Sequence, residues 1–242
     1  FINFFNTPDF FKLLRNTLIL SLYNLVITFP MPIILALAVN ELKSKAYKKV
    51  VQMVTYLPYF ISTVVLVGTM KNIFSPRTGL INSIIALFGG PQTDFMGNPD
   101  LFRTMYVWSG VWQGMGWSSI IYISALSGVD PQTHEAAIID GATKEQRMIH
   151  VDLPAIKPTV VMLLILQLGS LMNVGLEKVY LLKNSLNQSA SAIISTYTYE
   201  VGLINSDYGY STAVGLFNSV INVILLVGAN WFCKKVADES LF

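Results

Sequence analysis

The sequence predicts an all-α membrane protein, a polytopic helical bundle with at least five transmembrane helices. Of its 242 residues, 53% are hydrophobic and only 12% are charged, whereas a soluble domain carries about 25% charged residues. Asp, Glu, Lys and Arg are also absent from five windows, each about as long as the roughly 17–25 residues that a helix needs to cross a bilayer. These windows are residues 16–40, 50–70, 104–129, 159–176 and 208–233.

The rest of the chain organises around these windows. A sixth charge-free window, residues 184–199, is too short and too rich in Ser, Thr and Asn to span, so we expect it outside the membrane. We expect residues 1–242 to form a single transmembrane domain. Because the chain begins with Phe1 and has an odd number of windows, we expect another span upstream, giving six or more in the full chain.

Basic residues orient the windows. The tightest basic cluster, KSKAYKK at residues 43–49, lies between the first two windows, and such clusters stay on the cytoplasmic side. Alternation then places residues 130–158 inside the cell, and residues 71–103 and 177–207 outside it.

Prolines interrupt the first two windows. Pro30 and Pro32 lie in the first window and Pro58 lies in the second. Each removes a backbone donor, so we expect a kink or an unwound turn at both places. The sequence leaves open whether these kinks serve packing or gating.

The longest stretch rich in charge and turn residues is 130–158. Asp130 is a predicted N-cap, followed by Pro131 at the first helical position. The first helix is expected over residues 131–140, ended by Gly141 in a left-handed conformation. Thr143 and Gln146 have the spacing of a capping box.

The capping box predicts a second short helix over residues 144–151, stopping at Leu153–Pro154. Helices this short are marginal alone, so both need a partner surface. Small side chains at Ala136 and Ala137 suit a groove on another protein. A loop helix packed against its own bundle is the alternative.

The segment EAAIIDGATKEQRMIHVDLP resembles the EAA loop of the membrane subunits of type I ABC importers. That motif reads Glu-Ala-Ala, three residues, Gly, nine residues, Ile-x-Leu-Pro, and here Val151 replaces the Ile and Met148 a common Phe. In that family the loop is a coupling helix that sits in a cleft of the ATP-binding subunit. The resemblance implies a cytoplasmic coupling loop over residues 128–158. Its expected coupling residues are Glu135, Ala136, Ala137, Asp140, Gly141, Ala142, Leu153 and Pro154.

The resemblance covers nearly the whole chain. The first two windows and GLINSIIALFGG are similar to sugar-importer permeases, and GLEKVYLLKN with the C-terminal segment resembles the branch for complex oligosaccharides, including aldouronate and alginate permeases. A departure is LKNSLNQ, where many sugar permeases have a Gly-Gly-Pro element. The resemblance implies a multi-pass permease of the bacterial cytoplasmic membrane, contacting lipid and forming an oligosaccharide path.

The same resemblance implies the partners. These are a second permease subunit in a heterodimer, two ATP-binding subunits and an external substrate-binding protein that docks on residues 71–103 and 177–207. The chain has no Gly-x-x-x-x-Gly-Lys-[Ser/Thr] phosphate loop, so we expect no ATPase site and no cofactor here, with ATP and Mg²⁺ held by the partner subunits. No catalytic residue and no nucleic-acid partner are expected.

Two further kinds of chemistry are disfavoured. His134 and His150 have no second Cys or His at metal-ligand spacing, so we expect solvated or interface histidines and no metal site. The windows lack mid-depth charges, which argues against a proton-driven carrier.

Uncharged polar and aromatic side chains near mid-depth are candidates for the substrate path. Amides bind sugar hydroxyls, although they also join helices, and tryptophans stack on saccharide faces. Both roles stay open. From the windows we take Asn24, Trp112, Gln113, Trp117, Gln167, Asn218 and Asn222, and the resemblance adds Asn173, Glu177 and Tyr180.

Two alternatives remain at this point. The chain is a permease for another solute, such as a glycerol phosphate or a peptide, or it is a non-transporting membrane scaffold that holds a partner through the cytoplasmic helix. ATP-dependent uptake of a labelled oligosaccharide separates these possibilities.

Overall fold

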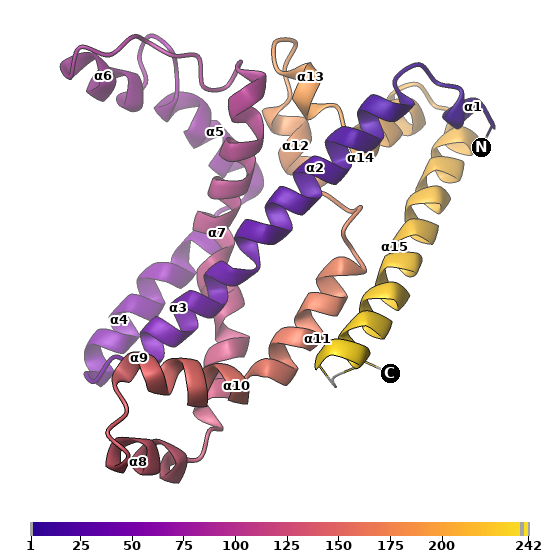
Figure 1. Cartoon of the computed structure of the whole chain (residues 1–242). Helices are drawn as coiled ribbons and strands as arrows, with labels where there is room; N and C mark the ends of the chain where they lie inside the picture. The colour runs from indigo at the N-terminus through magenta and orange to yellow at the C-terminus, as the bar shows by residue number, and fades with distance from the viewer. Residues whose placement is uncertain (1, 238–239, 242) are drawn as a thin grey trace. The chain divides into compact units, whose positions relative to one another are not determined.

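The computed structural model describes residues 2–237 and 240–241, and every regular element among these residues is a helix. The contacts divide the chain into two compact units. Unit 1 comprises residues up to 25, 61–109 and 170–223, and unit 2 comprises residues 26–60, 110–169 and those from 224 on. Three long helices belong partly to each unit (Figure 1). They are α2 (Phe10–Thr28), α7 (Pro99–Ser127) and α15 (Tyr208–Ala237).

The remaining elements each fall in one unit. Unit 1 holds α1 (Ile2–Phe5), α5 (Thr63–Ile73), α6 (Leu80–Leu87), α12 (Leu176–Leu182), α13 (Gln188–Ser191), α14 (Ile194–Tyr199) and η3 (Glu200–Ile204). Unit 2 holds α3 (Pro30–Asn40), α4 (Lys45–Tyr56), η1 (Leu57–Phe60), α8 (Pro131–Ile139), α9 (Lys144–Arg147), η2 (Met148–Asp152), α10 (Leu153–Ala155) and α11 (Lys157–Leu168).

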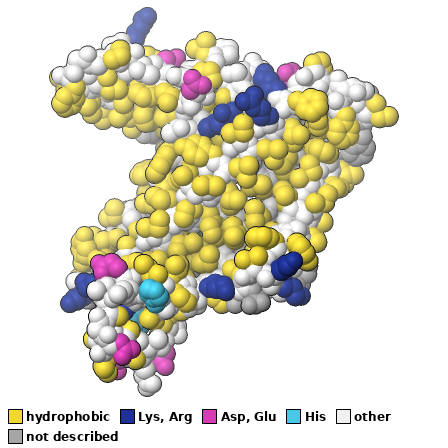
Figure 2. Space-filling model, in the orientation of Figure 1, with side chains coloured by type: hydrophobic (Ala, Val, Ile, Leu, Met, Phe, Trp, Pro, Cys, Tyr) yellow, Lys and Arg dark blue, Asp and Glu magenta, His cyan; other side chains and the backbone are white. Residues whose placement is uncertain are grey.

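Two of the predicted spans are continuous apolar segments. Phe10–Asn40 has 31 residues and α15 has 30, and both are long and apolar enough to cross a membrane. Only 11% of the most apolar window of α15 is buried within the chain, so most of its side chains are left for lipid or a partner. Figure 2 shows hydrophobic side chains over the visible faces of the long helices.

The predicted count of five spans is not confirmed. Lys45–Ile73 and Lys144–Leu168 are interrupted pairs of helices, so the described residues give two spans, or four if each pair counts as one. Helix α7 has 29 residues and is therefore long enough to span, but it is not among the helices that are both long and apolar enough. Its Gly, Ser and Gln residues lower its apolarity.

The sequence predicted one spanning helix over residues 159–176, but the structure divides this window into separate parts. Helix α11 ends at Leu168, with Gly169 as its C-cap, and α12 begins only at Leu176. Glycine destabilises a helix interior by about 1 kcal/mol relative to alanine, and Ser170, Asn173 and Gly175 follow it closely. The charge-free window therefore contains a break.

The proline positions coincide with interruptions. Helix α2 ends at Thr28 and α3 begins at Pro30, so a single residue separates them. Pro58 lies in η1, a short 3-10 helix after α4. The predicted break is confirmed next to Pro58, where Lys45–Phe60 and Thr63–Ile73 are bent by 96°. At Phe29 the backbone keeps helical angles, so Phe10–Asn40 continues as one segment. A gating role stays a prediction.

The core of unit 2 joins α3, the end of α7 and the start of α11. Ile33, Ala36 and Leu37 of α3 pack with Tyr122 and Leu126 of α7 and with Ile156, and all six are buried. Ile156 is fully buried although it lies between α10 and α11. The start of α11 is therefore fixed to α3 and α7.

One glycine of α7 allows the close approach of another helix. A Cβ on Gly116 would collide with the backbone carbonyl of Thr55 in α4, whereas one on Gly114 would meet nothing within 4 Å. Gly116 is therefore required where α4 crosses α7.

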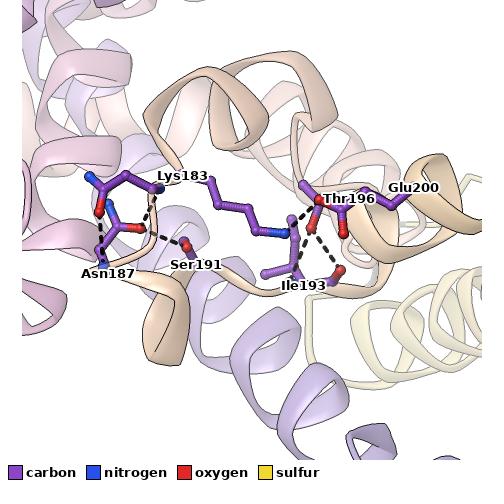
Figure 3. Close-up of polar contacts among 7 residues, drawn as sticks. Lys183, Asn187, Ser191, Ile193, Thr196 and Glu200 are labelled. Carbon is purple, nitrogen blue, oxygen red and sulfur yellow. Dashed lines mark hydrogen bonds and ion pairs between the residues drawn. The ribbon is translucent and has the colours of Figure 1, made fainter. Parts of the chain in front are cut away.

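Polar side chains hold the external segment of unit 1 together. Asn187 is 1% exposed. Its amide nitrogen donates to Met96 O and Leu182 O at 2.9 and 3.0 Å, and its oxygen accepts from Ser191 Oγ at 2.8 Å. On the other side of the same segment, Lys183 Nζ lies 2.6 Å from Glu200 Oε1 (Figure 3).

Helix α2 is tied to this segment by a second buried amide. Asn16 Nδ2 donates to Ser189 O and Ala192 O at 2.8 and 3.0 Å, and Asn16 Oδ1 accepts from Arg103 Nη2 at 3.1 Å. The segment at residues 184–199 is therefore an ordered structure of two short helices, and it does not span.

A buried lysine closes the packing of α12 on α7. Lys178 is 9% exposed, and its Nζ donates to Tyr106 O at 2.9 Å and lies 4.9 Å from the centroid of the Tyr106 ring. Burial lowers the pKa of Lys178 from 10.5 to about 8.

Candidate coupling surface and substrate path

Helix α8 is built as the sequence predicts. Asp130 Oδ1 accepts the amide hydrogen of Gln132 at 2.9 Å, and Pro131 occupies the first turn. The helix ends at Ile139, and Gly141 follows with a φ of 81°. The predicted cap and the left-handed glycine are confirmed.

The second helix begins as predicted and ends differently. Thr143 and Gln146 form the capping box, with bonds of 2.7 and 3.3 Å between side chains and backbone amides. The helix does not stop before Leu153–Pro154, since η2, a π-helical turn, carries it on to α10. Pro154 is tolerated because it lies in the first turn of α10, where its missing donor costs little.

The surface of this stretch offers apolar side chains that the chain itself does not cover. Ile138 and Ile139 are 55% and 85% exposed. Glu135, Ala136 and Asp140 are also exposed. Figure 2 shows acidic and histidine side chains over α8 and α9.

A hollow of about 320 Å³ lies between the end of α8 and the α9–η2 segment. Its lining includes four of the predicted coupling residues, namely Ala137, Asp140, Gly141 and Ala142. The four remaining predicted residues are exposed, Glu135 and Ala136 on α8 and Leu153 and Pro154 in α10. The structure therefore brings half of the predicted set into one concave surface.

The structure gives one histidine a contact within the chain. His134, predicted to be solvated or at an interface, is 27% exposed, and its Nε2 lies 3.2 Å from Asp152 Oδ1, whose side chain is 1% exposed. Burial raises the pKa of Asp152, and the positive charge of His134 opposes this shift. His150 is exposed, and its ring Nδ1 lies 2.9 Å from Gln146 O.

Two path candidates of unit 1, Asn173 and Asn222, come together as a joint between helical segments. Asn222 is 8% exposed, accepts from the Met172 amide at 3.0 Å and donates to Asn173 Oδ1 at 3.2 Å. Asn222 therefore joins α15 to the turn after α11, which favours the helix-joining role for this amide. Asn218, one turn earlier on α15, has a buried Oδ1 with no hydrogen-bond partner among the described residues.

The other candidates of unit 1 lie elsewhere. Glu177 and Tyr180 are exposed on α12, and the Tyr180 ring lies 5.0 Å from that of Tyr199. Asn24 is half-buried on α2.

The aromatic candidates of unit 2 form a stack. Trp117 is 41% exposed and lies parallel to Tyr59 at a centroid distance of 4.7 Å, with the Phe60 ring edge-on at 5.8 Å. One face of Trp117 is therefore occupied by Tyr59. Trp112 is 49% exposed on the same helix. Gln113 and Gln167 are half-buried on α7 and α11.

Sequence reasoning missed several buried polar groups. The pair of His134 with Asp152, the buried Lys178 and the amides Asn16 and Asn187 were not predicted. A usable signal existed for Asp152, which stands as a lone acid directly before Leu153–Pro154. Tyr59 and Phe60 next to Pro58 were also candidates for aromatic contact.

Comparisons with known proteins are consistent across the chain. The family described as "Binding-protein-dependent transport system inner membrane component" matches residues 14–238. Protein LplB of Bacillus subtilis (strain 168) is 46% identical over the whole chain and 76% of the relative. The polygalacturonan/rhamnogalacturonan transport system permease protein YteP of the same organism is 44% identical over the whole chain and 75% of the relative.

A solved structure gives the same result for the fold. A chain of a bacterial alginate ABC transporter, in complex with an alginate pentasaccharide-bound periplasmic protein, superposes with a TM-score of 0.96 and 37% sequence identity. The match covers 99% of this chain and 83% of that chain.

Proposed function

The chain belongs to the family of binding-protein-dependent transport system inner membrane components, and from this premise we propose that it forms the translocation path for an oligosaccharide in an ATP-driven importer. Relatives that carry a polygalacturonan/rhamnogalacturonan or an alginate name support this substrate class. The subunit lies in the bacterial cytoplasmic membrane with several spans. It pairs with a second permease, two ATP-binding subunits and an external substrate-binding protein.

The observation that carries the proposal is the exposed surface of α8. A nine-residue helix is marginal by itself, yet α8 is capped at both ends and leaves Ile138 and Ile139 uncovered. An apolar helix surface of this kind fits a groove on a partner. In the proposed importer that groove belongs to an ATP-binding subunit.

The proposed mechanism is alternating access. ATP and Mg²⁺, bound by the partner subunits, supply the energy, and closure of these subunits pulls on α8. The pull reaches the spans through η2 and α10, since Ile156 at the start of α11 is buried against α3 and α7. The cavity then opens outward to receive sugar, and ATP hydrolysis resets it.

The proposed path uses neutral contacts. The charge-free windows offer amides and aromatic rings, which hydrogen-bond and stack on sugars without binding ions. Trp112, Trp117 and Tyr180 are the exposed rings among the predicted candidates. The external segments at residues 71–103 and 177–207 receive the binding protein.

The test is uptake into vesicles reconstituted with the complete importer. We expect labelled oligosaccharide to enter only with internal ATP, and we expect Glu135→Ala and Gly141→Val to abolish uptake, the second because a φ of 81° excludes a β-branched residue. Lys12→Ala, at an exposed site on α2, serves as the control. Uptake that survives both substitutions contradicts the coupling role.

The same vesicles separate the alternatives. ATP-dependent uptake of a glycerol phosphate or a peptide, without uptake of any oligosaccharide, identifies a permease for another solute. Binding of the ATPase subunits without ATP-dependent uptake of any of these solutes identifies a scaffold.

A further inference from the structure

We propose that His134 and Asp152 form a latch that fixes the coupling helix α8 to the start of α11, so that movement of α8 reaches the spans. The latch rests on the proposed coupling function and adds two positioning residues, neither of which is part of the Glu-Ala-Ala, Gly and Leu-Pro register. It joins the two arms of the loop that Gly141 separates.

The contact itself is short and largely shielded from water. His134 Nε2 lies 3.2 Å from Asp152 Oδ1, and the two side chains are 27% and 1% exposed. A carboxylate removed from water is costly unless it is paired. His134 is the one basic group within ion-pair distance of Asp152 among residues 2–237 and 240–241.

The other charged groups near Asp152 come from two further elements. Glu41 at the end of α3 raises the pKa of the Asp152 carboxyl, in addition to the larger effect of burial, and Arg147 of α9 lowers it. The acid of Glu41 and the burial both work against an ionised Asp152. His134 on α8 opposes these two effects more strongly than Arg147 does.

The latch lies next to the packed start of α11, through which movement of α8 would reach the spans. Asp152 is the last residue of η2, and its carbonyl accepts the amide of Ile156 at 3.1 Å. Ile156 is fully buried in the core with Leu37 of α3 and Tyr122 of α7. A pull on His134 is therefore transmitted within one helical turn to the packed ends of three helical segments.

Without the latch, the connection from α8 runs through a soft segment. Residues 140–143 link α8 to α9, and Gly141 has the left-handed conformation that ends a helix. We expect such a connector to bend when α8 moves, so that less of the displacement of α8 reaches α11. A shielded ion pair between the two arms shortens this route and makes it stiffer.

The experiment measures sugar transported per ATP hydrolysed by the complete importer in vesicles. We expect His134→Ala and Asp152→Asn each to lower this ratio about fivefold, while the ATPase subunits stay bound. Because they remove the same interaction, the double variant should lose no more than either single variant. Lys12→Ala, which breaks the exposed contact with Asp9 at 3.8 Å, is the matched control and should keep the wild-type ratio.

Rescue by a conservative variant distinguishes a latch from a merely structural contact. His134→Lys keeps a basic group opposite Asp152 and should restore the ratio that His134→Ala lowers.

The outcomes separate the latch from the function on which it rests. A wild-type importer without ATP-dependent uptake contradicts the proposed function and the latch together. Normal wild-type uptake with an unchanged ratio in His134→Ala, or with no recovery of the ratio in His134→Lys, contradicts the latch alone. If Asp152→Asn fails to fold, His134→Ala and His134→Lys still decide between these outcomes.

Discussion

The external segment at residues 182–200 and the cytoplasmic stretch at residues 130–158 are both made of short helices, yet they use their side chains in opposite ways. In the external segment, Asn187 is buried and bonded to three other backbone or side-chain groups, and Lys183 is paired with Glu200. In the cytoplasmic stretch, Ile138 and Ile139 are exposed. The first region pairs its polar groups within the chain, whereas the second leaves apolar side chains uncovered that a partner could bury.

This difference separates folding from function. Buried polar groups must be paired inside the chain, because an unpaired one costs about 1–3 kcal/mol. Side chains kept exposed at a capped helix cost little and remain available for binding. Substitutions in the external segment should therefore change stability, and substitutions on α8 should change assembly.

The largest expected effect is on the stability of the external segment. Asn187→Ala removes this partner from the Leu182 carbonyl, the Asn184 amide and the Ser191 hydroxyl, and should cost about 4 kcal/mol of unfolding free energy, although Met96 O keeps the Asn184 side-chain amide at 2.8 Å. Thermal unfolding of the purified permease in detergent measures this loss of stability. The adjacent exposed Gln188→Ala is the control. Equal melting temperatures for the two variants would show that this segment is not held by Asn187.

A smaller effect is expected from pH at the buried lysine. Lys178 has a pKa of about 8 in the folded chain against 10.5 ordinarily, because burial penalises its charge. The unfolded chain therefore binds more protons between these values, and stability should rise as pH increases from 7.5 to 9.5, by about 2 kcal/mol.

The matching variant is Lys178→Met, which keeps the packing volume and removes the titrating group. Its melting temperature should lack the part of the pH dependence that Lys178 causes. A rise of the same size in both proteins would mean that another group titrates.

The smallest effect on folding is expected on α8. Ile139 is 85% exposed, so Ile139→Ser should leave the melting temperature of the isolated permease unchanged. If α8 inserts into an ATPase groove, the same substitution should cost about 2 kcal/mol of binding, or roughly 30-fold in affinity. Leu186→Ser, at an exposed site of the external segment, should leave ATPase binding unchanged. Equal affinities for the two variants would remove α8 from the interface.

Local signals in the sequence predicted much of the cytoplasmic stretch. The caps at Asp130 and Thr143 and the left-handed Gly141 depend on neighbouring residues, so a single sequence contains the required information. The continuation through η2 was missed because a π-helical turn depends on how the chain packs rather than on a residue type.

The breaks in the membrane segments and the buried polar contacts were harder to predict. Absence of charge located residues 159–176 correctly as apolar, but it does not distinguish a helix from the turn that begins after Leu168. His134 and Asp152 are 18 residues apart, and Asn16 bonds to residues more than 170 positions away. Such pairs follow from tertiary structure. Among the path candidates, the contact of Asn222 with Asn173 favours the helix-joining role.

The most direct test of the account is photo-crosslinking from one residue in each region of the assembled importer. A crosslinking amino acid at Ala137, which lines the hollow beside α8, should capture an ATP-binding subunit. The same group at the exposed Leu186 should capture the external binding protein and no ATPase. Absence of any ATPase adduct from position 137, in a complex that hydrolyses ATP, would contradict the claim that α8 couples the permease to its energy source.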